Sequence, residues 1–247
     1  MPSFQCGAFM ACDQTATVSA GTLEPLLVYL HGIGDTAGET EYQVKKHGPW
    51  ADVNSLDGGY HPDAVAGIRR FRILGLHVAA QNGDWDPVQV SNAIQEYLAE
   101  HPEVDPARIS LTGISRGGRG VLRVAIHRLQ IGQPVHSVAA FCPEGGNQYN
   151  QQQIALLHQV PIYFFHAAED PVVAFHGTQA LQNTIGDAFC RLRVIHPGER
   201  HYPKSPHACW TYVYGNPDLY AWLLQPLPLP PANWPNLLLP YARTAGS

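Results

Sequence analysis

One short motif constrains this chain most: Ser115 with a glycine two residues before it and another two residues after it, Gly113-Ile114-Ser115-Arg116-Gly117. The motif joins an extended apolar run, residues 109–112, to a helix-like run, residues 121–129. A backbone that turns sharply from strand to helix has no room for side chains at those two flanking positions, which explains both glycines. Such a turn pushes the serine hydroxyl outward, so the motif predicts a nucleophile elbow.

Extended and helical segments alternate on both sides of this motif. A helix is predicted from Asp86-Pro87, with aspartate as the N-cap and proline as the first helical residue, to His101. Further helices are predicted over residues 121–129 and 173–185, and a last one over about 208–225, broken near Gly215-Asn216-Pro217. The predicted strands are residues 25–30, 71–78, 108–112, 135–142, 161–166 and 188–195. This alternation predicts an α/β fold: a mostly parallel sheet covered by helices on both faces, with ligand sites at the carboxyl ends of its strands.

Length and composition favour one large domain. The 247 residues have a net charge of -5 and no basic run, which argues against a surface built for nucleic acid or anionic lipid. The five cysteines form no C-x-x-C pair, so neither a disulfide framework nor a zinc knuckle is indicated. With no apolar run long enough for a membrane helix and no recognisable signal peptide, we expect a cytoplasmic protein without membrane insertion.

The expected domain comprises residues 1–225. Beyond it the composition changes to Pro226-Leu227-Pro228-Leu229-Pro230-Pro231, which cannot continue a helix. We expect residues 226–247 to be an extended tail that packs on the domain.

A serine attacks an ester or amide only when a base takes its proton and an acid orients that base. In folds with a nucleophile elbow the acid comes next along the chain, on a loop after a later strand. Asp170, just after the strand at residues 161–166, fits this order, and Pro171 stops the strand from continuing. Glu169 is the rival acid, and helix capping is the alternative role for both carboxylates.

The base must then be a histidine that follows the acid. His176 lies within the predicted helix 173–185, whereas His196, His201 and His207 all follow the last strand. His207 precedes the final helix, from where its side chain can turn back towards the sheet. We predict that His207 is the base, with His201 as the next candidate and His196 the last.

The negative oxygen of the tetrahedral intermediate needs two N–H donors. The first is the backbone amide of Arg116, the residue after the nucleophile, and the second is expected in the loop His31-Gly32-Ile33-Gly34-Asp35 after the early strand. The amide of Ile33 is the predicted second donor. For His31 itself we expect a structural role, bracing the loop.

These motifs together resemble the α/β-hydrolase superfamily, in particular its small lidless esterases and peptidases of the dienelactone hydrolase, carboxylesterase and phospholipase branch. Four segments carry the resemblance: Leu30-His31-Gly32-Ile33-Gly34-Asp35, residues 113–117, residues 165–173, and His207 with Trp210 and Tyr220-Ala221-Trp222-Leu223-Leu224. The resemblance implies an α/β-hydrolase fold without a large lid. The expected antiparallel first strands are poorly marked in residues 1–22, and the Pro-rich tail has no counterpart in the family's pattern.

The predicted activity is hydrolysis of a small carboxylic ester through Ser115, His207 and Asp170, with no cofactor and no metal. The short connection between residues 141 and 160 favours short or water-soluble esters. Trp85 and Trp210 are the candidate substrate-binding residues, with core packing as the alternative. The side chain of Arg116 could pair with Asp35 or with an acidic group of the substrate, the structural role being preferred.

Parts of the sequence are also compatible with three other functions. The same machinery can cut amides, so a peptidase is the nearest alternative. A dinucleotide-binding oxidoreductase would use Gly32, Gly34 and Ala37 with Asp52 or Asp57, but the segment after these glycines makes a poor helix. A ligand-binding pseudoenzyme would leave the complete set of serine, acid and histidine unexplained.

Overall fold

The fold is built on one eight-stranded sheet with the strand order β1-β2-β4-β3-β5-β6-β7-β8. The computed structural model describes residues 3–33, 44, 47–50, 67–78, 83–145, 148–198 and 205–225. The strands are β1 Phe4–Cys6, β2 Phe9–Gln14, β3 Glu24–Leu30, β4 Arg72–His77, β5 Val104–Ile114, β6 Ser137–Phe141, β7 Ile162–Ala167 and β8 Cys190–Ile195. Only β2 runs antiparallel to its neighbours β1 and β4; all other pairs are parallel.

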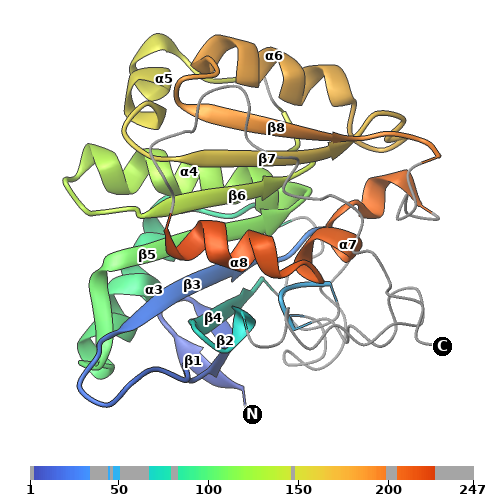
Figure 1. Ribbon diagram of the computed structural model, residues 1–247. Helices are drawn as coiled ribbons and strands as arrows, with labels where there is room; N and C mark the ends of the chain where they lie inside the picture. The colour runs from blue at the N-terminus through green and yellow to red at the C-terminus, as the bar shows by residue number, and fades with distance from the viewer. Residues whose placement is uncertain are drawn as a thin grey trace, which may run out of the picture.

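Helices cover both faces of this sheet (Figure 1). They are α3 Pro87–Glu100, α4 Arg116–Gln130, α5 Gln151–Leu157, α6 Phe175–Ile185, the 3-10 turn η1 Pro206–Ala208, α7 Trp210–Tyr214 and α8 Pro217–Leu224. One hydrophobic core joins one face of the sheet to residues of α3, α4, α5 and α6, and a second core joins the other face to α7 and α8. The predicted α/β fold is therefore confirmed.

The predicted strands at residues 25–30, 135–142 and 161–166 agree with β3, β6 and β7, because these sequences are mostly continuous apolar runs. Every residue of β4, β6 and β7 is buried, as expected for strands covered on both faces. The predicted break in the closing helix is also present. It separates α7 from α8, whose N-cap Asn216 accepts a hydrogen bond from the amide of Asp218 at 2.9 Å.

The start of the sheet, expected within residues 1–22, has only a weak signal in the sequence. Residues 4–14 form the β1–β2 hairpin, whose strands are only three and six residues long and include the polar residues Gln5, Asp13 and Gln14. The predicted start of β5 is too late: Val104 already pairs with Glu24, and the register shifts between Glu24 and Leu26. Asp105-Pro106 conceals this part of the strand, because proline cannot donate a ladder hydrogen bond.

Helix α4 begins directly at Arg116, five residues before the predicted start. Its first turns contain Gly117, Gly118 and Gly120, which disfavour a helix on propensity alone. Packing requires these glycines: a Cβ on Gly118 would lie 2.6 Å from the carbonyl oxygen of Phe141, and one on Gly120 would lie 2.9 Å from the indole of Trp85. Tertiary contact therefore overrides propensity here.

Some sequence predictions fall outside the described residues. These include His201, Asp35, the Pro-rich tail of residues 226–247 and most of the loop expected over residues 48–68. All five cysteines are described, and each is a buried free thiol. Across the described segments, no helix has both the length and the apolar character needed to cross a lipid bilayer.

Candidate active site

Ser115 lies on the sharp turn between β5 and α4. Its φ of 52° is in the left-handed region, which costs a residue with a side chain of the order of 1–3 kcal/mol. The turn is fixed by its amide, which donates to the carbonyl of Phe141 at 2.9 Å. A Cβ on Gly113 would overlap the backbone of Gly117, and one on Gly117 would overlap the carbonyl oxygen of Leu30. Neither position can therefore carry a side chain, as the sequence motif predicts.

Three predicted residues from three separate segments meet at this turn. The Nε2 atom of His207 in η1 lies 3.2 Å from the Oγ of Ser115, and its Nδ1 lies 2.8 Å from the Oδ2 of Asp170 in the loop after β7. With Nδ1–H donating to the carboxylate, Nε2 is left as an acceptor facing the serine hydroxyl. This arrangement can remove the proton from Ser115.

The carboxylate of Asp170 has no exposed side-chain surface. Its Oδ1 accepts hydrogen bonds from the amides of Val172 at 2.8 Å and Val173 at 3.0 Å. Its Oδ2 faces His207 and, at 3.2 Å, the Nε2 of His166. Burial alone raises the pKa of Asp170, but the hydrogen bonds from His166, His207 and the two amides outweigh it and hold the pKa well below the usual range. Asp170 is therefore ionised at neutral pH.

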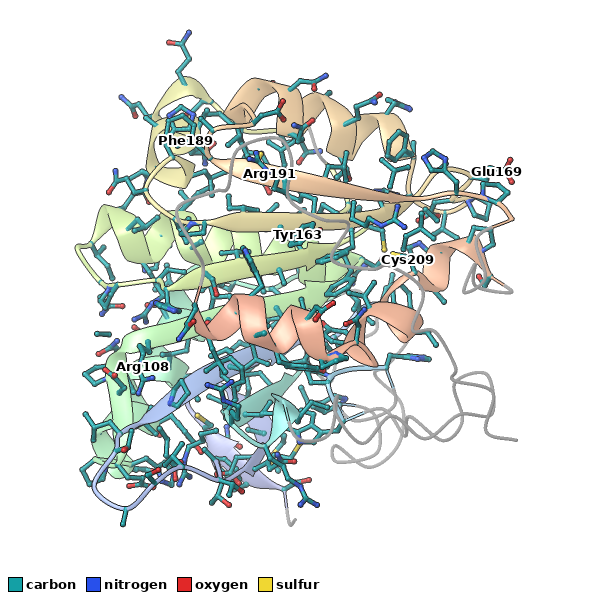
Figure 2. All side chains as sticks on the ribbon, viewed as in Figure 1. Arg108, Tyr163, Glu169, Phe189, Arg191 and Cys209 are labelled. Carbon is teal, nitrogen blue, oxygen red and sulfur yellow. The ribbon has the colours of Figure 1, made fainter. Side chains whose placement is uncertain are left out.

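The rival residues lie elsewhere where they are described. Glu169 is exposed, and Figure 2 shows it at the outer edge of the molecule, pointing away from the sheet. His196 is exposed after β8, and His176 belongs to α6 as expected. Of the described candidates, Asp170 and His207 contact each other, and His207 also contacts Ser115.

The loop after β3 runs beside the nucleophile. A Cβ on Gly32 would lie 3.6 Å from the Cβ of Ser115, so the backbone of residues 31–33 passes the serine closely. Arg116 is the first residue of α4, where amides have no partner within the helix. The segments that carry the two predicted oxyanion donors, the loop after β3 and the start of α4, thus both lie next to Ser115.

His31 braces this loop, as the sequence analysis expected. Its buried ring accepts a hydrogen bond from the amide of Val78 at Nε2 (3.0 Å) and donates from Nδ1 to the carbonyl of Gly32 (2.7 Å). Burial lowers the pKa of His31 to about 4, although the bond to Gly32 acts in the opposite direction. The ring is therefore neutral at pH 7 and ties the end of β3 to the end of β4.

The side chain of Arg116 donates to the carbonyl of Gly83 at 2.9 Å. Its predicted partner Asp35 is outside the described residues. One turn and two turns further along α4, Arg119 and Arg123 both bind Asp84, at 3.0 Å and 2.6 Å. These arginines thus fasten α4 to the segment that precedes α3, and none of these contacts was predicted from the sequence.

The two tryptophans predicted as substrate-binding residues, with core packing as the alternative, are both buried. Trp85 is only 1% exposed, packs on His31 and Phe9, and donates from its indole to the carbonyl of His31 at 3.1 Å. Burial of this large side chain stabilises the core. Trp85 thus supports the loop after β3 and lines no open surface. Trp210 is 6% exposed and meets the ring of His207 edge-on, with centroids 5.2 Å apart. Trp210 thus packs against the ring of His207 and supports its position.

A depression of about 280 Å³ opens beside the site, between the loops that follow β6 and β7. Pro143, Gln148, Val173 and His176 are among its lining residues. The sequence analysis had not assigned it, although Pro143 and Val173 both follow predicted strands at the edge where ligands are expected.

A further group at the site has the donor types of a metal centre. The Sγ of Cys142, a carboxylate oxygen of Asp170 and a ring nitrogen of His207 lie within 4.8 Å of one another. Burial, and then a hydrogen bond with Cys209, raise the pKa of Cys142 well above its usual value. Because a metal binds the thiolate, these residues fit a metal poorly. The thiol instead donates to the carbonyl of His207 at 3.6 Å, and so supports the histidine backbone.

Solved structures of hydrolases share this fold. A thermostable esterase matches with a TM-score of 0.70 and 20% identity, covering 90% of this chain and 62% of that chain. A putative dienelactone hydrolase from Klebsiella pneumoniae matches with a TM-score of 0.56 and 15% identity, covering 88% of this chain and 93% of that chain. The acylaminoacyl peptidase of Pyrococcus horikoshii matches with a TM-score of 0.61 and 13% identity, covering 94% of this chain and 42% of that chain. The chain thus spans less than two thirds of the esterase and of the peptidase.

Fold and comparisons together place the protein in the α/β-hydrolase superfamily. The family model described as the dienelactone hydrolase family matches residues 78–208, just over half of the chain. The chain belongs to the dienelactone hydrolase family. A search of curated proteins found no match. The superfamily predicted from the sequence is confirmed, and the dinucleotide-binding oxidoreductase is not the class to which this chain belongs.

Proposed function

We propose that the protein is a serine hydrolase that cleaves small carboxylic esters through an acyl-enzyme. The observation that carries the proposal is the continuous chain of contacts from Ser115 through His207 to Asp170, at 3.2 Å and 2.8 Å. Membership of a hydrolase family supports the same reaction class. The proposed catalytic domain comprises residues 1–225.

In the proposed mechanism His207 takes the proton of Ser115 while the Oγ attacks the substrate carbonyl. The developing oxyanion receives hydrogen bonds from the amides of Ile33 and Arg116, each typically worth ~10²-fold or more in rate. His207 then passes the proton to the leaving alcohol. Water attacks the acyl-enzyme with His207 as the base, which regenerates Ser115. No cofactor enters either half-reaction.

Short or water-soluble esters are the proposed substrates. The described residues between β6 and β7 contain one short helix, α5, so this connection brings little surface for a long acyl chain. The depression between the loops after β6 and β7 offers Gln148 and His176 as polar groups beside apolar Pro143 and Val173. That mixed lining suits a small substrate of moderate polarity.

Amide cleavage is the second candidate. An acylaminoacyl peptidase and a puromycin hydrolase are among the solved structures that share the fold. Both reactions use the same serine and histidine, and they differ in whether the protonated histidine delivers its proton to an amine. A p-nitrophenyl ester series of increasing acyl length, assayed beside peptide amides, separates the two.

The proposal is tested by Ser115→Ala. Turnover of a short p-nitrophenyl ester should disappear, labelling by a fluorophosphonate should be lost, and the circular dichroism spectrum should stay unchanged. Arg108→Ala, at the opposite end of β5, is the matched control and should hydrolyse the ester normally. Ester turnover by folded Ser115→Ala at the unmodified rate would refute the proposal.

A further inference from the structure

The ring of His166 on β7 is one of the few polar side chains with no exposed surface. Each of its nitrogens has a polar neighbour. Nε2 lies 3.2 Å from the Oδ2 of Asp170 and 3.0 Å from the carbonyl oxygen of Val173, and Nδ1 lies 2.8 Å from the Oγ1 of Thr178. Both nitrogens of this buried ring are therefore paired, as a buried polar group requires.

These neighbours define which nitrogen carries the hydrogen. A carboxylate and a carbonyl oxygen can only accept, so Nε2 must be the N–H that donates towards both. In the neutral ring Nδ1 is then an acceptor, and the hydroxyl of Thr178 is the donor facing it. Thr178, on α6 and fully buried, supplies the hydroxyl that satisfies Nδ1 of this tautomer and holds the ring with its N–H towards Asp170.

The donation from His166 completes the surroundings of the carboxylate. The amides of Val172 and Val173 hold Oδ1, and His207 binds Oδ2. Without His166, Oδ2 keeps a single donor, and burial leaves no water to replace the lost one. The carboxylate could then tilt, and the in-line contact with His207 Nδ1 would weaken.

The same ring also shapes the loop that carries the acid. His166 is on the strand, Asp170 is four residues further on, and Val173 is near the end of the loop. One imidazole thus binds the start, the acid and the end of the turn. It contacts neither Ser115 nor the site of the reacting carbonyl, so its effect on the reaction passes through Asp170.

We propose that His166, oriented by Thr178, is a positioning residue that fixes the Asp170 carboxylate for its hydrogen bond to His207. The proposal rests on the proposed function, in which that hydrogen bond orients the base. Because misplacement of a catalytic group by about 1 Å can cost ~10²-fold in rate, removal of the donor should act on kcat.

The test compares His166→Phe, which keeps a ring but removes both nitrogens, with His166→Gln, whose amide can place an N–H near the position of Nε2. We expect kcat on a short ester to fall ~10- to 100-fold in His166→Phe, with KM within about twofold, and His166→Gln to recover most of the loss. His136→Phe is the matched control, since that histidine binds the carbonyl of Leu224 at the other end of the sheet, and it should keep the full kcat.

A second pair of variants covers the case in which His166→Phe does not fold. Thr178→Val removes the hydroxyl that binds Nδ1 and holds the ring of His166, and it should lower kcat, whereas Thr178→Ser keeps the hydroxyl and should not. The downfield proton NMR signal of His207 Nδ1–H should weaken or shift in Thr178→Val and stay in Thr178→Ser.

The NMR signal reports the hydrogen bond between His207 and Asp170 without any substrate. It therefore separates failure of this proposal from failure of the proposed function, which would appear as normal turnover by Ser115→Ala. An unchanged signal and an unchanged kcat in folded Thr178→Val, or equal kcat in His166→Phe and the unmodified protein, would overturn the positioning role.

Discussion

His207 Nδ1 and Asp170 Oδ2 lie 2.8 Å apart, and the carboxylate that makes this contact is completely buried. The short bond sets the tautomer of His207 and leaves its Nε2 free to accept from Ser115, 3.2 Å away. Because surrounding donors lower the pKa of Asp170, the acid keeps its charge over the range in which esters are assayed. The orientation of His207 thus depends on this carboxylate.

Asp170→Asn should therefore be nearly inactive. An amide can present N–H to Nδ1 and favour the wrong tautomer, which in serine hydrolases typically costs ~10⁴-fold in kcat. Glu169→Gln makes the same chemical change one residue earlier, on an exposed side chain, and should keep normal kinetics. Steady-state hydrolysis of a short p-nitrophenyl ester measures both, and similar rates for the two variants would contradict the assignment of the acid.

Gly117→Ala should lose both stability and activity. The added methyl group would overlap the carbonyl oxygens of Leu30 and His31, which are parts of the sheet and the loop and cannot move aside. We expect the free energy of unfolding to fall by about 2 kcal/mol or more, the range of overpacked cores. Gly32→Ala, whose methyl group would meet its nearest neighbour at 3.4 Å, should unfold close to the unmodified protein in urea. A stable, active Gly117→Ala would contradict the elbow geometry.

The buried ring of His31 should make the fold sensitive to mild acid. Its pKa is lowered to about 4 by burial, so in the unfolded chain, near pH 6.5, it takes up a proton before the folded chain does. Its contribution is therefore present above pH 6.5 and is lost as the pH falls towards 4. We expect protonation of His31 to lower the free energy of unfolding by about 2 kcal/mol between pH 7 and pH 5. Urea unfolding at both pH values should show a smaller loss in His31→Gln, and an equal loss in the two proteins would contradict the prediction.

Arg72 should stabilise the fold without affecting catalysis. Its buried guanidinium binds Glu24 at 2.5 Å, Glu103 at 2.6 Å and Asp13 at 3.4 Å, at the start of β4 and so at the end of the sheet away from Ser115. Removing it in Arg72→Met leaves carboxylates without their counter-charge and should cost about 3 kcal/mol.

The control for Arg72 is Arg108→Met, which breaks the half-exposed pair with Asp105 and should cost less than about 1 kcal/mol. Chemical denaturation gives both values. Below the unfolding temperature, Arg72→Met should hydrolyse ester at the normal rate, and a fall in kcat without a fall in stability would show that the cluster acts on the site.

The parts of the fold that could be predicted were those with local signals. Buried parallel strands are continuous apolar runs, so β3, β6 and β7 stand out, and the glycines at 113 and 117 record a steric need that only a few backbone turns have. The order of the residues along the chain then selected the acid and the base, because the carboxyl ends of parallel strands share one edge of the sheet. Ser115, Asp170 and His207 could be selected for this reason.

What could not be predicted depends on contacts between distant segments. Trp85 is typical of a binding-site aromatic in the sequence, but the packing of α4 against the loop after β3 encloses it. His166 is one histidine among thirteen and lies inside an apolar strand, so only its contacts with Asp170 and Thr178 single it out. The β1–β2 hairpin is stabilised by pairing with β4, which local propensity does not reveal.

The central claim is that Ser115 forms a covalent acyl-enzyme. Rapid acid quenching of the protein with a p-nitrophenyl ester, followed by peptide mass spectrometry, tests it most directly. We predict that the mass of one acyl group appears on the peptide containing Ser115, and that the adduct is absent in Ser115→Ala. Continued turnover with no acylated Ser115 peptide, or acylation of another residue such as Cys142, would contradict the account.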